Sequence, residues 1–238
     1  MQSKKWLLLT GVATGLAAVL AIAKPATADA IIYQNLPTSL ATPPNISFHN
    51  AIGPVIADDF VPIAGGTVTT VTWWGSAPTS NDWEIVLQNN NPAVGEPALT
   101  PPGNNVTGGV KALPVVAVGV PFAPLPGVFQ FTADISSLVN FAVNPGTDYW
   151  ITIANFEPGW NWALALGGPT IGTENFNAHM STGGICLDGG PHCGPWTDIH
   201  TDFAVQISAV PEPGTIAFIG FGLAAFGLAR RRRRTQTA

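Results

Sequence analysis

The sequence predicts an all-β domain, an antiparallel β-sandwich of jelly-roll-like form, flanked by an N-terminal signal peptide and a C-terminal transmembrane helix. Three observations lead to this prediction. Short stretches of the chain alternate between apolar and polar residues, these stretches are rich in β-branched and aromatic residues, and runs of Gly, Pro and Asn separate them. Each end of the chain, in contrast, holds a mainly apolar segment beside basic residues.

The alternation is clearest in the stretch DWEIVLQN at residues 82–89. Trp83, Ile85 and Leu87 would lie on one face of a strand there, with Glu84 on the other face. The same behaviour occurs in TVTTVTWWG, GVFQFTADI, DYWITIANF, NWALAL and DFAVQISAV. Turn-forming runs such as NPGTD, FEPGW and DGGPHCGP lie between these stretches, so the middle of the chain is expected to form strands joined by turns.

The N-terminal segment has the three parts of a secretory signal peptide. Lys4 and Lys5 form a basic region, residues 6–23 form the apolar region, and small residues follow with cleavage expected after Ala28 or Ala30. The expected partners are the Sec translocon and signal peptidase. An uncleaved N-terminal anchor is the alternative.

The C-terminal segment has the composition of a short membrane helix followed by a basic stop. Residues 215–229 carry no charge and would form a helix about 22 Å long, short of the roughly 30 Å of a bilayer core. Snorkelling arginine stems and local thinning of the membrane can close this gap. The membrane-stop cluster consists of Arg230, Arg231, Arg232, Arg233 and Arg234. Because basic flanks stay in the cytoplasm, the body of the protein is expected outside the inner membrane.

The order of the C-terminal features resembles the PEP-CTERM sorting signal of Gram-negative bacteria. Pro211, Glu212 and Pro213 come first, the apolar segment follows, and the arginine cluster ends the signal. The resemblance covers about the last 28 residues. It implies recognition by an exosortase, cleavage near the Pro-Glu-Pro motif, and a place at the cell surface or in the extracellular matrix among exopolysaccharide and biofilm components. A plain C-terminal anchor is the alternative. The expected division is residues 1–30 as signal peptide, 31–209 as β-sandwich ectodomain and 210–238 as sorting and anchor segment.

The charge of the body excludes some classes of partner. Between residues 31 and 210 Lys111 is the only Lys or Arg, against twelve Asp and Glu. Such a body repels nucleic acid and anionic membrane surfaces. The chain also has no GxSxG, no HExxH and no Gly-rich phosphate loop, so we expect that it is not an enzyme.

Tryptophans are the first candidates for a binding site, because seven of the eight lie in the body. Trp73 and Trp74 are neighbours and would face opposite sides of a strand, so one of them should be exposed or covered by a loop. Exposed indoles can stack on sugar rings, whereas buried ones fill a core. The candidates for glycan binding are Trp74, Trp160, Trp162 and Trp196.

The two cysteines, Cys186 and Cys193, are expected to form a disulfide in an exported protein. Closing so short a loop would contribute roughly 2.5 kcal/mol by the chain-entropy estimate. The alternative is a zinc site made by both thiolates with neighbouring side chains, drawn from Asp188, His192, His179 and His200.

Asp58 and Asp59 are candidates for a calcium site, with Asp82, Asp198 or Asp202 as further ligands. The alternative is that the pair begins a strand, with one carboxylate in a turn hydrogen bond. The chain has no EF-hand or other loop of fixed ligand spacing, and no other cofactor is expected.

Together these features predict an exported structural or adhesive protein of the cell surface or biofilm matrix, with glycan binding to exopolysaccharide as a candidate activity. The first alternative is a secreted glycan-active hydrolase. The second is a permanently membrane-tethered domain that faces the periplasm.

Overall fold

The computed structural model describes residues 29–40, 54–91, 95–97, 109–181 and 196–211. Within these ranges every regular element is a β-strand and every strand pairing is antiparallel. The predicted all-β antiparallel class is therefore confirmed. No helix in the described part of the chain has the length and apolar character needed to cross a membrane. The predicted signal peptide and C-terminal helix lie outside the described residues.

Eight strands of six residues or more form the body: β1 (Ala30–Asn35), β3 (Val55–Phe60), β4 (Gly66–Gly75), β5 (Asp82–Asn91), β7 (Gly109–Val116), β9 (Phe129–Asp134), β11 (Tyr149–Asn155) and β15 (Val205–Val210). Seven short strands extend the sheets: β2 (Ser39–Leu40), β6 (Glu96–Pro97), β8 (Val120–Pro121), β10 (Ala142–Val143), β12 (Ala163–Leu164), β13 (His179–Ser181) and β14 (Thr197–Asp198).

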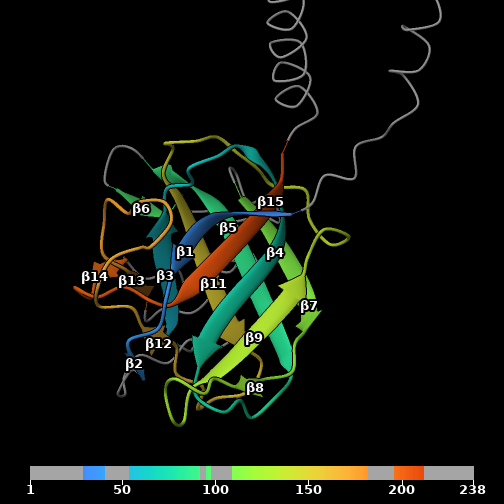
Figure 1. Cartoon of the computed structure of the whole chain (residues 1–238), viewed down its shortest axis with the longest axis vertical. Coiled ribbons are helices and arrows are strands. Elements are labelled where there is room, and N and C mark those ends of the chain that lie inside the picture. Colours follow the sequence, from blue (N-terminus) through green and yellow to red (C-terminus); the bar gives the residue numbers. More distant parts are fainter. Residues whose placement is uncertain (1–28, 41–53, 92–94, 98–108, 182–195, 212–238) are drawn as a thin grey trace, which may run out of the picture.

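The long strands form two sheets. One has the order β1-β15-β4-β9 and the other contains β3-β11-β5 with β7 on the far side of β5. Figure 1 shows β4 and β9 crossing in front of β5 and β11, as expected of two stacked sheets. With the eight strands numbered in chain order, the sheets read 1-8-3-6 and 2-7-4-5, which is the strand order of a jelly roll. The first and last strands are neighbours, so the two ends of the body lie together.

The two sheets share one apolar core, and aromatic rings cross between them. Trp73 on β4 and Phe131 on β9 come from one sheet, and Trp83 on β5 comes from the other. The ring centre of Trp83 lies 5.1 Å from Trp73, 4.8 Å from Phe131 and 4.8 Å from Trp160. Edge-to-face and tilted ring pairs at such distances contribute beyond their buried area, so this cluster ties the sheets to each other.

Trp74 points away from that core and is nevertheless buried. It packs with Val128, Ala163 and Ala204 under the segment that follows β8, and its ring meets Phe122 edge-on at 6.0 Å. The prediction that Trp73 and Trp74 face opposite sides is confirmed. The loop that contains Phe122 covers Trp74, so this side chain is not exposed to solvent.

The only Lys or Arg of the body, Lys111, forms an ion pair within the second sheet. Lys111 on β7 forms an ion pair of 2.8 Å with Glu84 on β5, and the Glu84 side chain is fully buried. A buried carboxylate needs such a partner, because burial without one is costly. Lys111 is therefore committed to Glu84 and offers no charge to the acids elsewhere in the sandwich.

We expect Trp160→Ala to lower the free energy of unfolding by about 3–5 kcal/mol, because it leaves a cavity where the ring meets Trp83 and Trp162. Guanidinium unfolding followed by circular dichroism measures this. Trp196→Ala is the matched control: Trp196 is partly exposed and should cost less than about 1 kcal/mol. Equal losses in the two variants would show that the ring cluster does not hold the sheets together.

Candidate functional site

The candidate site is a group of carboxyl groups that begins on β3. Asp58 and Asp59 have no exposed surface. Successive residues of a strand face opposite sides, and Ile56 and Phe60 belong to the shared core, so Asp58 points into the sandwich and Asp59 points away from it. The two adjacent acids therefore do not form a chelating pair by themselves.

Each of these two carboxylates accepts backbone hydrogen bonds with one oxygen only. Asp58 Oδ2 accepts from the amide of Phe203 at 2.9 Å. Asp59 Oδ2 accepts from the amides of Asn175 at 2.8 Å and Phe176 at 3.3 Å. The Oδ1 atoms of both residues are buried and have no hydrogen-bond partner among the described residues. The pair lies near the end of β3 and not at its beginning, and both carboxylates, not one, accept backbone hydrogen bonds. Calcium binding by these residues stays a prediction.

Glu174 reaches the site from the segment that precedes β13. The backbone of Thr173 pairs with Val61 just beyond β3, which holds this segment against the end of the strand. Gly172 permits the approach: its φ is +88°, and a Cβ there would lie 2.6 Å from the Val61 carbonyl oxygen. Glu174 is thereby placed beside Asp58 and Asp59 by backbone contacts.

Two residues of β1 donate to the Glu174 carboxylate. The Tyr33 hydroxyl donates to Glu174 Oε2 at 3.0 Å, and the Asn35 amide donates to the same oxygen at 3.1 Å. Tyr33 and Asn35 are two residues apart on the strand, so they share a face. Asn35 is only 1% exposed, and its Oδ1 has no partner in the described part of the chain.

Asp202 completes the group from the segment that leads into β15. Its carbonyl oxygen accepts from the Ala165 amide at 2.9 Å, and the next residue, Phe203, donates to Asp58. Its side chain forms a hydrogen bond with Glu174, and its buried Oδ1 has no described partner. We call Asp58, Asp59, Glu174 and Asp202 the acidic cluster.

The electrostatics of the acidic cluster follow from burial without a counter-charge. Burial, and then the neighbouring carboxylates, raise the pKa of Asp58 well above its usual value. Burial raises the pKa of Asp59 and of Glu174 to about 7 each, and it also raises the pKa of Asp202. Burial and the nearby Asp58 and Glu174 carboxylates raise the pKa of Tyr33. The hydrogen bond between the two side chains raises the pKa of Glu174 and lowers that of Asp202, while burial keeps both pKa values above their usual range.

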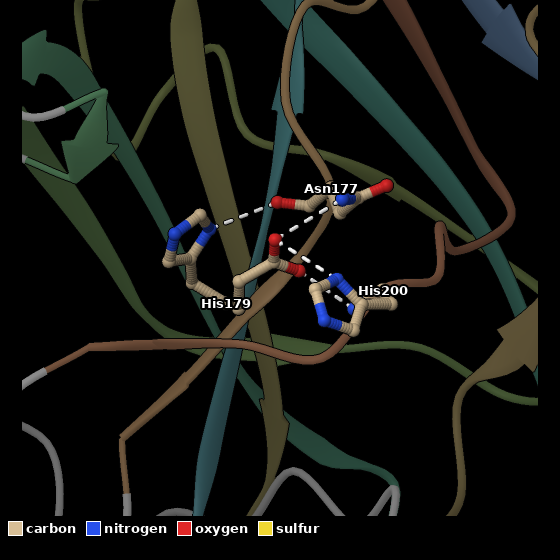
Figure 2. A network of polar contacts seen from close by, with 4 residues as sticks. Asn177, His179 and His200 are labelled. Carbon is tan, nitrogen blue, oxygen red and sulfur yellow. Dashed lines mark hydrogen bonds and ion pairs between the residues drawn. The ribbon is translucent and has the colours of Figure 1, made fainter.

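Asp198 belongs to a separate polar network, shown in Figure 2. Its Oδ2 accepts from the Asn177 amide at 3.1 Å and lies 3.1 Å from Nδ1 of His200, while its Oδ1 accepts from the His200 backbone amide. That last bond fixes a turn in which His200 adopts a φ of +54°. His179 is directed to the Asn177 carbonyl oxygen at 2.8 Å, so the carboxylate of Asp198 and a backbone oxygen hold the two histidines in this network.

The other predicted ligands are placed differently. Asp82 begins β5, which pairs with the end of β11 that is far from the acidic cluster. Trp150, opposite Asp59, and Asn155, next to Asp82, are about 17 Å apart along the strand. Of the three further calcium ligands that the sequence suggests, only Asp202 joins Asp58 and Asp59. Among the described residues no group of three or more Asp, Glu, His or Cys is arranged as a ready-made metal centre.

The glycan-stacking prediction is wrong for three of its four tryptophans. Trp160 and Trp162 are fully buried in the core and Trp74 is 3% exposed, so none of them offers a ring face to a sugar. The physical reason is that the indoles supply the apolar area that the sandwich needs, and Trp162 also donates its N–H to the Ala204 carbonyl at 2.9 Å. Trp196 alone is partly exposed.

The remaining predicted site residues belong to the two ends of the body and to the cysteine loop. Pro211 follows β15 directly and is partly exposed. The others lie outside the described ranges: Cys186, Asp188, His192, Cys193, Glu212, Pro213 and Arg230–Arg234.

Comparison with known families bears on the C-terminal end. A family model described as the PEP-CTERM protein-sorting motif matches residues 209–234. The chain carries a PEP-CTERM sorting motif. The matched range begins on the last two residues of β15 and ends at the last arginine of the cluster. A search of curated protein sequences found no match to the chain.

The match confirms the resemblance drawn from the tail, and the motif implies export and processing by an exosortase. Sequence reasoning did not find Glu174, Asn35 and Tyr33. Glu174 is separated from Asn35 by 139 residues and from Tyr33 by 141. No local spacing connects positions so far apart, so only the fold reveals them.

The raised pKa values predict a stability that falls as pH rises. Between about pH 4 and pH 7 the folded cluster keeps protons that the unfolded chain has released, so folding is favoured at the lower end of this window. The groups that face the cluster are Tyr33 and Asp198, the latter paired with His200. In buffer without divalent cations we expect the free energy of unfolding to be about 1–3 kcal/mol lower at pH 8 than at pH 5. Urea unfolding at both pH values measures this, and stability that rises with pH would contradict it.

Proposed function

We propose that this protein is an exported structural or adhesive component of the cell surface or extracellular matrix, delivered there by exosortase sorting. The PEP-CTERM motif at residues 209–234 is the observation that carries the proposal. The all-β jelly-roll body supports this proposal, because it contains one Lys and no Arg. Such a body lacks the positive charge that binds nucleic acid and suits a released, soluble domain.

The sorting motif begins within the last strand of the body, so the distance between the body and the apolar segment is short. Ala209 pairs with Ala30 on one side and with Val68 on the other, and Val210 pairs with Thr67. Only residues 211–214 separate the end of β15 from the apolar segment. In the proposed membrane intermediate the sandwich is therefore held close to the bilayer, with Arg230–Arg234 on the cytoplasmic side.

We expect the mature protein to retain β15 in full. Cleavage before Val210 would remove strand pairings within a sheet, so the mature C-terminus should lie at Val210 or beyond. At the other end Asp29 Oδ2 accepts a hydrogen bond from Thr70 at 3.1 Å and Ala30 pairs with Ala209, which favours cleavage after Ala28. Intact mass of the protein released from cells measures both ends.

Intact mass also tests sorting when it is measured in a strain that lacks the exosortase and in a strain that carries a variant of the arginine cluster. Removal of the exosortase should leave a precursor that retains residues 215–234 in the membrane fraction, whereas replacing Arg230–Arg234 with Gln should weaken retention and lower the yield of processed protein. Retention of residues 215–234 in the wild-type strain would instead establish the permanently tethered alternative.

An adhesive role has support in a strip of exposed apolar side chains. Val116, Val118 and Val120, at the end of β7 and the start of β8, are 67%, 66% and 64% exposed. Such side chains give an exported sandwich a surface for weak contacts with matrix or with other copies. Of the four tryptophans predicted to bind glycan, Trp196 is the one with an accessible ring.

We expect Val118→Lys to reduce co-sedimentation of the protein with matrix from its own cells by at least about threefold, because it places a charge in the centre of the strip. Trp196→Ala distinguishes glycan stacking from apolar contact, since only stacking needs the indole. Undiminished co-sedimentation of both variants would remove the support for adhesion through these groups.

The hydrolase alternative gains no support from the acidic cluster. Glu174 and Asp202 share a hydrogen bond, which brings their carboxyl groups closer than the about 5–5.5 Å of retaining glycosidases. Release of reducing ends from exopolysaccharide, abolished by Glu174→Gln, would establish the enzyme instead.

A further inference from the structure

The acidic cluster and the adjacent Asn35 contain oxygen atoms that have no hydrogen-bond partner among the described residues. Asn35 Oδ1, Asp58 Oδ1 and Asp202 Oδ1 are buried and accept no hydrogen bond from any described residue. Asn35 is an independent indication, because it is neutral, only 1% exposed and held with its amide against Glu174. Buried acceptors without donors are rare in folded proteins and call for a bound group.

The negative charge of the acidic cluster also indicates a bound cation. Asp58, Glu174 and Asp202 lie within interaction distance of one another, and no Lys or Arg of the described residues faces them, because Lys111 is paired with Glu84. The nearest basic groups lie in the Asp198 network, where His200 is an exposed partner of another carboxylate. A bound cation would satisfy these oxygens and also offset the charge of the carboxylates.

We propose that Asp58, Glu174, Asp202 and Asn35 bind one calcium ion at the junction of β1, β3 and the segment that leads into β15. Carboxylate and amide oxygens are the ligands that Ca²⁺ prefers, and it accepts six to eight of them in an irregular arrangement. Water supplies the remaining positions. Zn²⁺ is a poor fit because these ligands include neither thiolate nor imidazole.

The site assembles when the ion binds. Asp58 and Asn35 are fixed, since both are buried on strands and each has one atom in a hydrogen bond. Glu174 and Asp202 are only half-buried and lie on connecting segments, so their carboxylates are able to turn toward the ion. This movement accounts for the lack of a ready-made centre among the described residues.

Calcium would join segments that the backbone brings together from distant parts of the chain. Asn35 belongs to the sheet that contains β15, and Asp58 belongs to the opposite sheet. Asp202 lies on the connection from β14 to β15 between these sheets, and Glu174 lies on the segment between β12 and β13. An ion at this place links the two sheets at the side where the sandwich has buried like charges in place of apolar packing. The bound ion would therefore replace the repulsion between the carboxylates with bonds that connect the two sheets.

The test uses the full chain, purified in mild detergent and stripped of metal with EGTA. At pH 7.5 we expect CaCl₂ at about 100 times its Kd to raise the Tm by about 5–10 °C. Calorimetric titration should give one ion per chain. MgCl₂ at equal concentration should raise the Tm less than half as much, because Mg²⁺ demands a regular octahedron.

Two matched variants locate the ion. Glu174→Gln should weaken Ca²⁺ binding at least about tenfold, while Glu157→Gln, the same change on an exposed loop, should bind as the wild type does. Glu174→Gln in EGTA at pH 8 should also be more stable than the wild type in EGTA, since it removes one of the repelling charges. If Glu174→Gln does not fold, the number of ions bound per wild-type chain and the calcium-induced shift of the wild-type Tm test the proposal.

The proposal is overturned if CaCl₂ up to about 10 mM, above the weakest affinity range of extracellular calcium modules, leaves the wild-type Tm unchanged. It is also overturned if Glu174→Gln and Glu157→Gln respond equally to calcium. Neither result depends on where the protein is sorted in the cell, so failure of this proposal and failure of the proposed function are separate outcomes.

Discussion

The pairing of the first strand with the last is the interaction on which the rest of the structure depends. β1 runs along β15, with Ala30 opposite Ala209 and Asn35 opposite Val205. This one pairing places Tyr33 and Asn35 beside the segment that carries Asp202, and it brings the two ends of the body together. The contacts of Tyr33 and Asn35 with the acidic cluster, and the position of the start of the sorting motif beside β1, thus both depend on this pairing.

Charge shapes the sandwich as much as apolar packing does. The body has one Lys, which is partly buried and paired with Glu84, so the other acids among the described residues have no Lys or Arg partner. Four of them lie together where β3, the segment around Glu174 and the segment around Asp202 meet. Backbone amides satisfy one oxygen each of Asp58 and Asp59, and the unsatisfied oxygens on the other side make this region the place where the fold depends on protons or a cation.

The tryptophans show how the need for a core overrides an apparent binding pattern. Trp160 and Trp162 share a face as their spacing suggests, but that face is the interior, where their rings meet at 6.2 Å. Trp74 faces out from the main core and is then covered by Phe122 and Val128. A side chain of this size gains more from burial than from exposure, so outward direction on a strand does not by itself make a binding surface.

Local patterns in the chain are enough to establish the class of fold, the sorting signal and five of the long strands, namely β4, β5, β9, β11 and β15. The strands β1, β3 and β7 do not stand out by alternation and were found only in the structure. Period-two alternation and the order of the C-terminal parts are such patterns, which is why residues 82–91 and 209–234 can be assigned from the amino-acid order alone. The same patterns single out Asp58, Asp59 and Asp202. The folded arrangement was needed to show that Asp202 and not Asp82 is their neighbour, that Glu174 and Asn35 join them, and that three candidate indoles are buried. These are contacts between residues as many as 145 positions apart, set by which strands pair and which sheets face each other, and no local spacing carries that information.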